Sequence, residues 1–170
     1  LYKGKHLLSF VDNHDVSRIA SLLQNEKHLP LIYALMFGMP GIPCVYYGSE
    51  WGAKARKEDG DPALRACFAA PEWTELTTFI SRLAEVKKSS EALNYGNFRS
   101  VLLTNKQCIF ERKSEHERVL VAINAEDAPF MAHFDAGCGM AQELITDTPH
   151  DFGGGSELPP YSAAIWKMEH

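Results

Sequence analysis

The sequence has 170 residues, of which 45% are hydrophobic and 23% are charged, a composition typical of a globular protein with one ordinary domain or two small ones. Its formal net charge of −5 argues against the basic surface that nucleic-acid binding requires. No apolar run approaches the roughly 18–20 residues of a membrane span, so neither nucleic acid nor membrane is an expected partner.

The first half of the chain alternates strand-like and helix-like segments. The apolar run 6–11 predicts a buried strand, residues 27–41 predict a helix, and residues 41–48 predict a second buried strand. After a long polar loop, residues 72–88 predict an amphipathic helix whose apolar face includes Trp73. This alternation indicates a parallel sheet with right-handed crossovers. Because two strands cannot cover a core, we expect further strands from residues outside this sequence.

The second half changes to short strands separated by turn residues at intervals of about ten. Such spacing predicts an antiparallel sandwich or Greek-key module. The expected strands are 98–105, 106–113, 117–125, 128–136, 140–147 and 162–168. Residues 151–161 are expected to form a loop, and their glycines lack the following Lys-Ser or Lys-Thr of a phosphate-binding loop. The two patterns divide the chain into residues 1–95 and 96–170.

The polar residues Asn13, His14 and Asp15 directly follow the first apolar run. Their residue types alone favour a turn that caps the next helix. Their position favours an active site, because functional groups of parallel α/β proteins gather just past the C-terminal ends of strands. A carboxylate and an imidazole at such a place can hold substrate hydroxyls or stabilise a cation.

Two motifs in the first half resemble those of glycoside hydrolase family 13, the α-amylase family. FVDNHDVSR at 10–18 resembles the F-x-x-N-H-D region around strand seven of that family. GIPCVYYGSEWG at 41–52 resembles its strand-eight pattern, G-x-P-x-x-Y-Y-G-x-E. GDPALR at 60–65 is similar to the Asp-Pro…Arg segment after strand eight in many members, notably of the cyclomaltodextrinase and neopullulanase types. LPPYSAAIWKM at 158–168 looks like the last strand of the family's C-terminal β-sandwich.

The resemblance implies a retaining α-glycosidase with a (β/α)8 TIM barrel and a β-sandwich behind it. This sequence would hold the last two β/α units, from strand seven to helix eight, and the complete sandwich. In such enzymes an Asp nucleophile follows strand four and a Glu acid/base follows strand five, roughly 5 Å apart. Neither segment is in the sequence, so we expect the chain alone to be inactive. Calcium in many members is held mainly by a domain inserted after strand three, so no cofactor or metal is expected in this chain.

The resemblance also implies roles for individual residues. Asp15 corresponds to the third carboxylate, which stabilises the transition state through charge-assisted hydrogen bonds to sugar hydroxyls. His14 donates to a hydroxyl of the same sugar, and Asn13 shapes the turn more than it touches substrate. Trp51 either stacks on a sugar or covers the top of the barrel, and Glu50 either organises its loop or reaches the site. The implied substrate is an α-glucan or a maltooligosaccharide.

Two other functions stay open at this point. The chain could be a carbohydrate-binding module with the sandwich as its working part. It could also be a structural, catalytically dead member of the family, although the intact Asn-His-Asp motif argues against this. As a fragment of a barrel, the chain would leave its apolar strands without their neighbours, so we expect self-association through exposed barrel surfaces.

The remaining observations concern origin and compartment. The four cysteines are too far apart for a zinc or redox C-x-x-C motif, which favours a reducing, cytoplasmic environment. The sequence opens on Leu1 without a signal segment, so we expect it to come from a longer protein.

Overall fold

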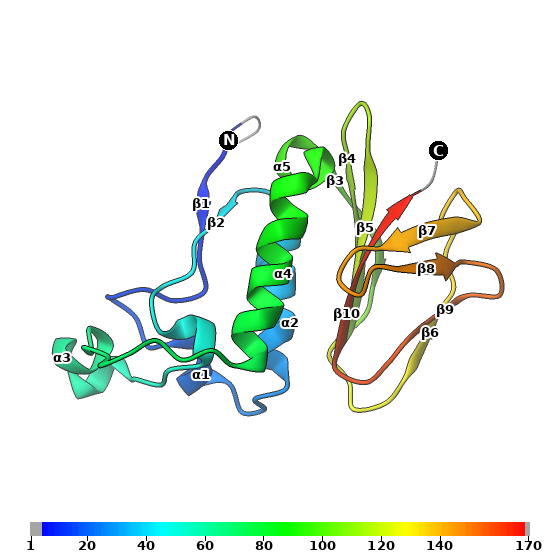
Figure 1. The fold of residues 1–170 in the computed structure, drawn as a ribbon. Coiled ribbons are helices and arrows are strands. Elements are labelled where there is room, and N and C mark those ends of the chain that lie inside the picture. The colour runs from blue at the N-terminus through cyan, green and yellow to red at the C-terminus, as the bar shows by residue number, and fades with distance from the viewer. Residues whose placement is uncertain (1–4, 169–170) are drawn as a thin grey trace.

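The computed structural model describes residues 5–168 and arranges them in layers (Figure 1). A two-stranded parallel sheet and irregular segments lie on one side, the helices α2 (His28–Gly38) and α4 (Glu75–Ser89) lie in the middle, and antiparallel strands lie on the other side. The expected order, a mixed helical and parallel part before an antiparallel part, is therefore observed. No helix of the described residues is long and apolar enough to cross a bilayer.

A parallel pair of strands carries the chain into and out of the first helices. Strand β1 (Leu8–Ser9) pairs with β2 (Ile42–Pro43), with Leu8 opposite Ile42. The short helix α1 (Ile19–Leu22) and then α2 lie between them in the sequence, as the alternating pattern predicted. This crossover brings the segments that follow β1 and β2 to the same end of the pair.

Both parallel strands are shorter and more exposed than predicted. Each covers two residues. Leu8 of β1 is 60% exposed and Ile42 of β2 is 51% exposed, because each strand has a single neighbour within residues 5–168. The prediction of two buried strands is therefore wrong for this chain on its own.

The segment before α4 was expected to be one long polar loop, and it contains short helical turns. They are η1 (Ser49–Trp51), η2 (Lys57–Asp59) and α3 (Asp61–Leu64). Gly48, Gly52 and Gly60 separate these turns with φ values of 86°, 80° and 84°. Glycine adopts this backbone region without the strain that other residues incur, so the chain can fold back on itself here.

Helix α4 begins at a capping box. The Thr74 hydroxyl accepts from the backbone N–H of Thr77 at 3.3 Å, and the Thr77 hydroxyl accepts from the backbone N–H of Thr74 at 3.2 Å. Ile80 and Leu83 on the apolar face are buried. Trp73, predicted on that face, precedes the cap and is 74% exposed, so this prediction was wrong.

The second half forms an antiparallel sheet in the strand order β3-β4-β5-β10-β7-β8, with a separate pair β6-β9. The strands are β3 (Asn97–Leu103), β4 (Gln107–Lys113), β5 (Arg118–Asn124), β6 (Phe130–Ala132), β7 (Met140–Glu143), β8 (Thr148–Asp151), β9 (Ser156–Leu158) and β10 (Ser162–Met168). Strand β9 lies within the predicted loop 151–161. That prediction was wrong because Ser156–Leu158 pairs with Phe130–Ala132, a partner distant in the sequence.

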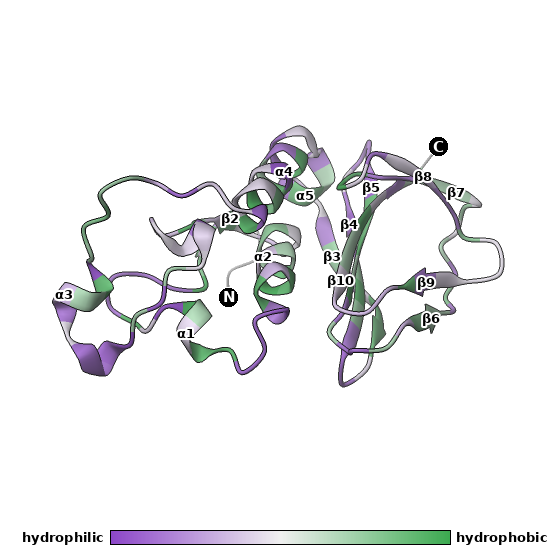
Figure 2. Cartoon of the chain, turned by 60° about the horizontal axis from the view of Figure 1, so that its bottom comes forward, coloured by the Kyte–Doolittle hydropathy of each residue, from purple (hydrophilic) through white to green (hydrophobic). Residues whose placement is uncertain are grey.

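The main sheet packs against an apolar cluster on each face, with α2 and α4 on one side and β6 and β9 on the other (Figure 2). In β5, Val119, Val121 and Ile123 pack in a cluster with residues of α2 and α4. Leu120 and Ala122 pack in a second cluster with residues of β6 and β9. Successive side chains of a strand point to opposite faces, so a strand buried on both faces reads as a continuous apolar run.

Two buried cations tie the ends of helices to neighbouring elements. Arg112 of β4 donates from Nη1 to the carbonyl of Gly38 at 2.8 Å and from Nη2 to the carbonyl of Gly96 at 2.9 Å. Lys87 of α4 donates from Nζ to the carbonyl of Leu93 in helix α5 (Glu91–Tyr95) at 2.8 Å. These bonds satisfy carbonyls at the C-terminal ends of α2 and α5, where helices leave acceptors without intrahelical partners.

Candidate active site

The chain turns sharply after β1, and Asn13 fixes the turn. Its Oδ1 accepts from the backbone N–H of Asp15 at 2.8 Å, the hydrogen bond of an Asx turn. The turn leaves the side chains of His14 and Asp15 48% and 62% exposed. Asn13 therefore holds the conformation that presents its two neighbours to solvent.

The Asp15 carboxylate lies between two positively polarised groups. His14 Nε2 is 3.2 Å from Asp15 Oδ2, and Arg65 Nη2 is 3.4 Å from Asp15 Oδ1. Arg65 directly follows α3, so the segment after β2 returns to the end of β1. The His14 ring lies 6.3 Å from the Tyr46 ring, between their centroids. Exposed ion pairs of this kind add little to stability, so these contacts orient the Asp15 carboxylate more than they stabilise the fold.

A buried polar network lies directly under this turn, and its members were not predicted from the sequence. Asp12 and Ser49 are almost completely buried. Ser49 Oγ donates to the Asp12 carboxylate, 2.9 Å from Oδ2, and Ile19 N donates to the same oxygen at 2.8 Å. Asp12 thus caps α1 and ties β1 to η1. The signal that could have identified it is a carboxylate within an otherwise apolar run, which needs hydrogen-bond partners once buried.

Arg18 connects the loops that surround the site. Its Nη1 donates to the carbonyl of Tyr47 at 2.7 Å and to Ser49 Oγ at 3.0 Å, and its Nη2 donates to the carbonyl of Leu64 at 3.1 Å. The guanidinium carbon lies 4.6 Å from the centroid of the Tyr46 ring, within cation–π range. Because Leu64 directly precedes Arg65, this buried arginine helps to set the position of the cation beside Asp15.

Aromatic side chains form a wall beside the strand-eight motif. The rings of Tyr46 and Tyr47 lie 4.7 Å apart, and Phe68 lies 5.8 Å from Tyr47 and 5.1 Å from Trp51. The Tyr47 hydroxyl donates to the carbonyl of Ala66 at 2.9 Å. Phe68, which the sequence did not single out, therefore links Trp51 to the two tyrosines.

Glu50 and Trp51 do not join the cluster around Asp15. The carbonyl of Glu50 accepts from the Thr77 hydroxyl at 3.0 Å, which ties η1 to the start of α4. Its Oε2 atom is buried and has no hydrogen-bond partner within residues 5–168. Within residues 5–168, no group of three His, Cys, Asp or Glu side chains is arranged to hold a metal ion.

Comparison with known proteins agrees with this architecture. The family model of the alpha-amylase catalytic domain matches residues 3–92. An alpha-amylase of Niallia circulans is 34% identical over 125 residues, which make up 72% of this chain and 23% of that protein. A cyclomaltodextrin glucanotransferase of the same species is 32% identical over 120 residues, 69% of this chain and 16% of that protein. The crystal structure of an Anoxybacillus alpha-amylase superposes with a TM-score of 0.86 at 25% identity, covering 95% of this chain and 38% of that one.

These matches place the chain in the class of glycoside hydrolases. The chain belongs to the α-amylase family, glycoside hydrolase family 13, because the family model covers more than half of the sequence. It spans less than a quarter of the length of the two curated relatives described above.

Proposed function

We propose that this chain is the C-terminal part of a retaining α-glycosidase that acts on α-linked glucans or maltooligosaccharides. Residues 1–95 are the last two β/α units of its (β/α)8 barrel, and residues 96–170 are the β-sandwich behind it. The proposal is supported by the match to the alpha-amylase catalytic domain and by the parallel pairing of β1 with β2 around α2. The relatives named above are an alpha-amylase and a cyclomaltodextrin glucanotransferase, which supports an α-glucan as the substrate class.

The observation that carries the proposal is the exposed carboxylate of Asp15 at the end of β1, with His14 at 3.2 Å and Arg65 at 3.4 Å. As the bond to the leaving group breaks, positive charge develops on the sugar ring. Asp15 accepts hydrogen bonds from sugar hydroxyls and stabilises that charge, and its bonds strengthen in the transition state. His14 donates to a hydroxyl of the same sugar, while Asn13 holds the turn.

The other candidate residues have supporting roles in this proposal. Trp51 contacts Phe68 edge to face, which supports a place in the wall of the site. Glu50 organises the loop through its bond from Thr77. The nucleophile and the acid/base come from segments outside this sequence, so the chain alone does not hydrolyse glycosidic bonds. Release of reducing sugar from maltooligosaccharides by the purified chain would contradict that statement.

The test is Asp15→Asn in the protein that carries this chain together with the first six units of the barrel. We expect kcat on maltooligosaccharides to fall by about 10²- to 10³-fold, the effect of losing one preorganised group that acts on the transition state. Asp59→Asn, an exposed carboxylate in η2, is the matched control and should leave kcat unchanged. Unchanged activity of Asp15→Asn would refute the catalytic role of Asp15, and a lack of activity in the unaltered protein would favour a carbohydrate-binding or structural member of the family.

A further inference from the structure

A cleft of about 540 Å³ lies where α5 meets the edge of the main sheet at β3 and β4. Two aromatic side chains line it, Tyr95 at 73% exposure and Phe98 at 45%. One exposed aromatic residue needs no explanation, but two rings in one cleft with a polar rim are typical of a ligand-binding surface. Helix α5 follows the C-terminal end of α4, whereas α3 lies toward the N-terminal end of α4 (Figure 1).

The backbone between the two rings is held in place. A Cβ atom on Gly96 would lie 2.4 Å from the carbonyl oxygen of Ala92 and 2.8 Å from the backbone N of Lys113, so only glycine lets α5 end this close to β4. Arg112 donates to the carbonyl of Gly96 at 2.9 Å. The Phe98 ring also packs on the buried ring of Phe110, 5.3 Å between centroids. Binding at such a surface requires little ordering of the protein.

The polar rim combines one fixed group with several free ones. Arg99 is held by Glu111 through contacts of 2.9 Å from Nε to Oε1 and 3.2 Å from Nη2 to Oε2. Hydrogen bonds from Arg99 and Arg118 lower the pKa of Glu111 to about 2, so this pair stays ionised at neutral pH. Within the described chain, the rim side chains that form no hydrogen bond or ion pair are those of Glu91, Asn97, Lys113 and Glu115.

We propose that this cleft is a second α-glucan site, separate from the strand ends that carry Asp15. A pyranose ring has an apolar C–H face that packs on an aromatic ring, and hydroxyls that need both donors and acceptors. Tyr95 and Phe98 each supply an aromatic ring, and the rim supplies amide, cationic and carboxylate groups. Because both signs of charge are present, the surface suits a neutral polyhydroxylated chain better than an anionic polymer. The choice of an α-glucan rests on the proposed function.

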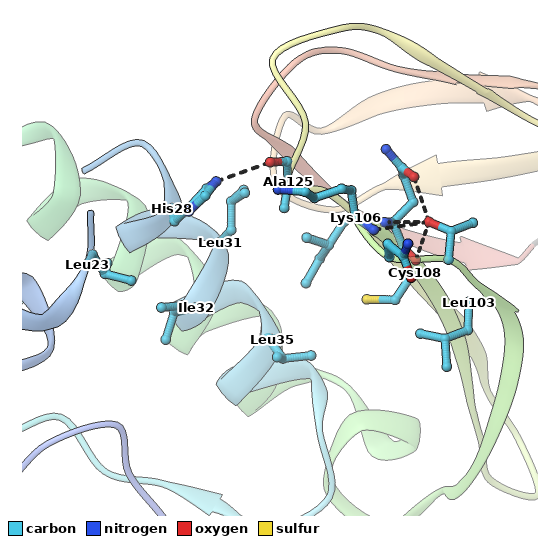
Figure 3. A pocket seen from close by; sticks show the side chains of 13 residues that line it. Leu23, His28, Leu31, Ile32, Leu35, Leu103, Lys106, Cys108 and Ala125 are labelled. Atoms are coloured by element: carbon cyan, nitrogen blue, oxygen red, sulfur yellow. Dashed lines mark hydrogen bonds between the residues drawn. The ribbon is translucent and has the colours of Figure 1, made fainter. Parts of the chain in front are cut away.

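A second cleft, of about 340 Å³, lacks the aromatic rings of the first and serves as a comparison (Figure 3). It lies between α2 and the turn that joins β3 to β4, and aliphatic side chains such as Ile32, Leu35 and Leu103 line it. No phenylalanine, tyrosine or tryptophan of the described chain contributes to it. One of its polar groups, His28 Nε2, is already paired with the carbonyl of Ala125 at 3.1 Å. It suits packing against protein and supplies a control residue, Leu103.

The experiment is isothermal titration of the purified 170-residue chain with maltoheptaose, which requires no catalysis. We expect the wild-type chain to bind at millimolar concentration and Tyr95→Ala to lose about tenfold in affinity, the loss equivalent to one ring contact. Phe98→Ala should show a similar loss, with thermal melting as the check that its fold persists. Leu103→Ala, at a position about as exposed as Tyr95 and in the same edge strand as Phe98, should bind as the wild type does.

The outcomes separate this site from the proposed active site. Binding that survives Asp15→Ala and is weakened by Tyr95→Ala supports the second site. Unchanged affinity in Tyr95→Ala, or no binding of maltoheptaose by the wild-type chain, overturns it. If Asp15→Ala alone removes binding, glucan binds only at the strand ends, and the proposed function stands without the second site. Equal affinity for a β-linked cellooligosaccharide would overturn the assignment of an α-glucan.

Discussion

The parallel pair and the main sheet differ in how many neighbours each strand has. Strand β1 has one neighbour in the described chain, extends over two residues and leaves Leu8 60% exposed. Strand β5 has two, extends over Arg118–Asn124 and buries Leu120 completely. Both segments are apolar in sequence. An apolar run therefore indicates a surface that needs covering, and the neighbouring strands decide whether it is covered.

The largest expected effect comes from removing a ring in the main sheet. Trp166 is 2% exposed and packs against the rings of His150, at 4.5 Å, and Phe152, at 5.4 Å. Trp166→Ala should lower the free energy of unfolding by ~3–5 kcal/mol, because it leaves a cavity that the sheet cannot close. Leu8→Ala should change it by less than ~0.5 kcal/mol. Urea unfolding followed by circular dichroism measures both, and equal losses would erase the contrast between the two regions.

A pH titration of stability tests the buried Lys87 of α4, the helix that lies between the parallel pair and the main sheet. Burial, and to a lesser degree the charge of Arg112, lowers the pKa of Lys87 from its ordinary 10.5 to about 8. Below pH 8 Lys87 is charged in both the folded and the unfolded protein. The full free-energy cost of burying that charge then lowers the stability of the folded state. Between pH 8 and 10.5 the folded form loses the proton first, so stability should rise by about 3 kcal/mol.

Lys87→Met is the matched variant for this titration, because methionine keeps an unbranched apolar side chain without the charge. Other groups titrate in the same range and contribute equally to both proteins. The difference between the wild-type and variant unfolding curves, measured from pH 7 to 11, therefore isolates Lys87. Parallel curves would mean that the lysine has its ordinary pKa in the folded state.

A smaller effect should distinguish the two aspartates of the candidate site. Asp12→Ala removes the acceptor of the Ser49 and Ile19 hydrogen bonds and should lower stability by ~1–3 kcal/mol. Asp15→Ala, which changes an exposed carboxylate, should lower it by less than ~0.5 kcal/mol. Thermal melting at neutral pH compares the two. A large loss in Asp15→Ala would make this residue part of the structural network.

The weakest expected effect is association through the exposed pair of strands. Leu7, Leu8, Phe10 and Ile42 are between 47% and 60% exposed, and we expect the wild-type chain to self-associate through them at micromolar concentration. Changing Leu8 and Phe10 together to Lys should shift light scattering toward the monomer. Met131→Lys, which alters an exposed apolar residue of β6, should not. A monomeric wild-type chain would contradict this expectation.

Local patterns predicted most of the elements but not their extents. Helix α4 was predicted because its apolar residues repeat with the helical period, whereas α2 was predicted from an almost wholly apolar segment and β4, β5 and β10 from short runs separated by turn residues. The strands β1 and β2 were predicted too long, since their length depends on neighbours outside the pair. Strand β9 was missed because Ser156–Leu158 is short, follows three glycines and pairs with a partner distant in the sequence.

The candidate site shows the same limit. Asn13, His14 and Asp15 could be proposed because they directly follow an apolar run within a family motif. Arg65 was noted only as part of a motif, and its contact with Asp15 depends on how the turns after β2 fold back. The buried network of Asp12, Arg18 and Ser49 joins residues more than thirty positions apart, and no local pattern signals such a pairing.

The exposure of Asp15 has a consequence for the strength of its electric field. Two unit charges 4 Å apart attract by about 1 kcal/mol in water and by about 4 kcal/mol at an effective dielectric constant near 20. A carboxylate that is 62% exposed acts near the lower limit, however well His14 and Arg65 orient it. Covering the strand ends with other surfaces would raise its effect on a sugar cation several-fold without moving an atom of the chain. In the proposed mechanism, the contribution of Asp15 to catalysis therefore depends on the surfaces that exclude water from it.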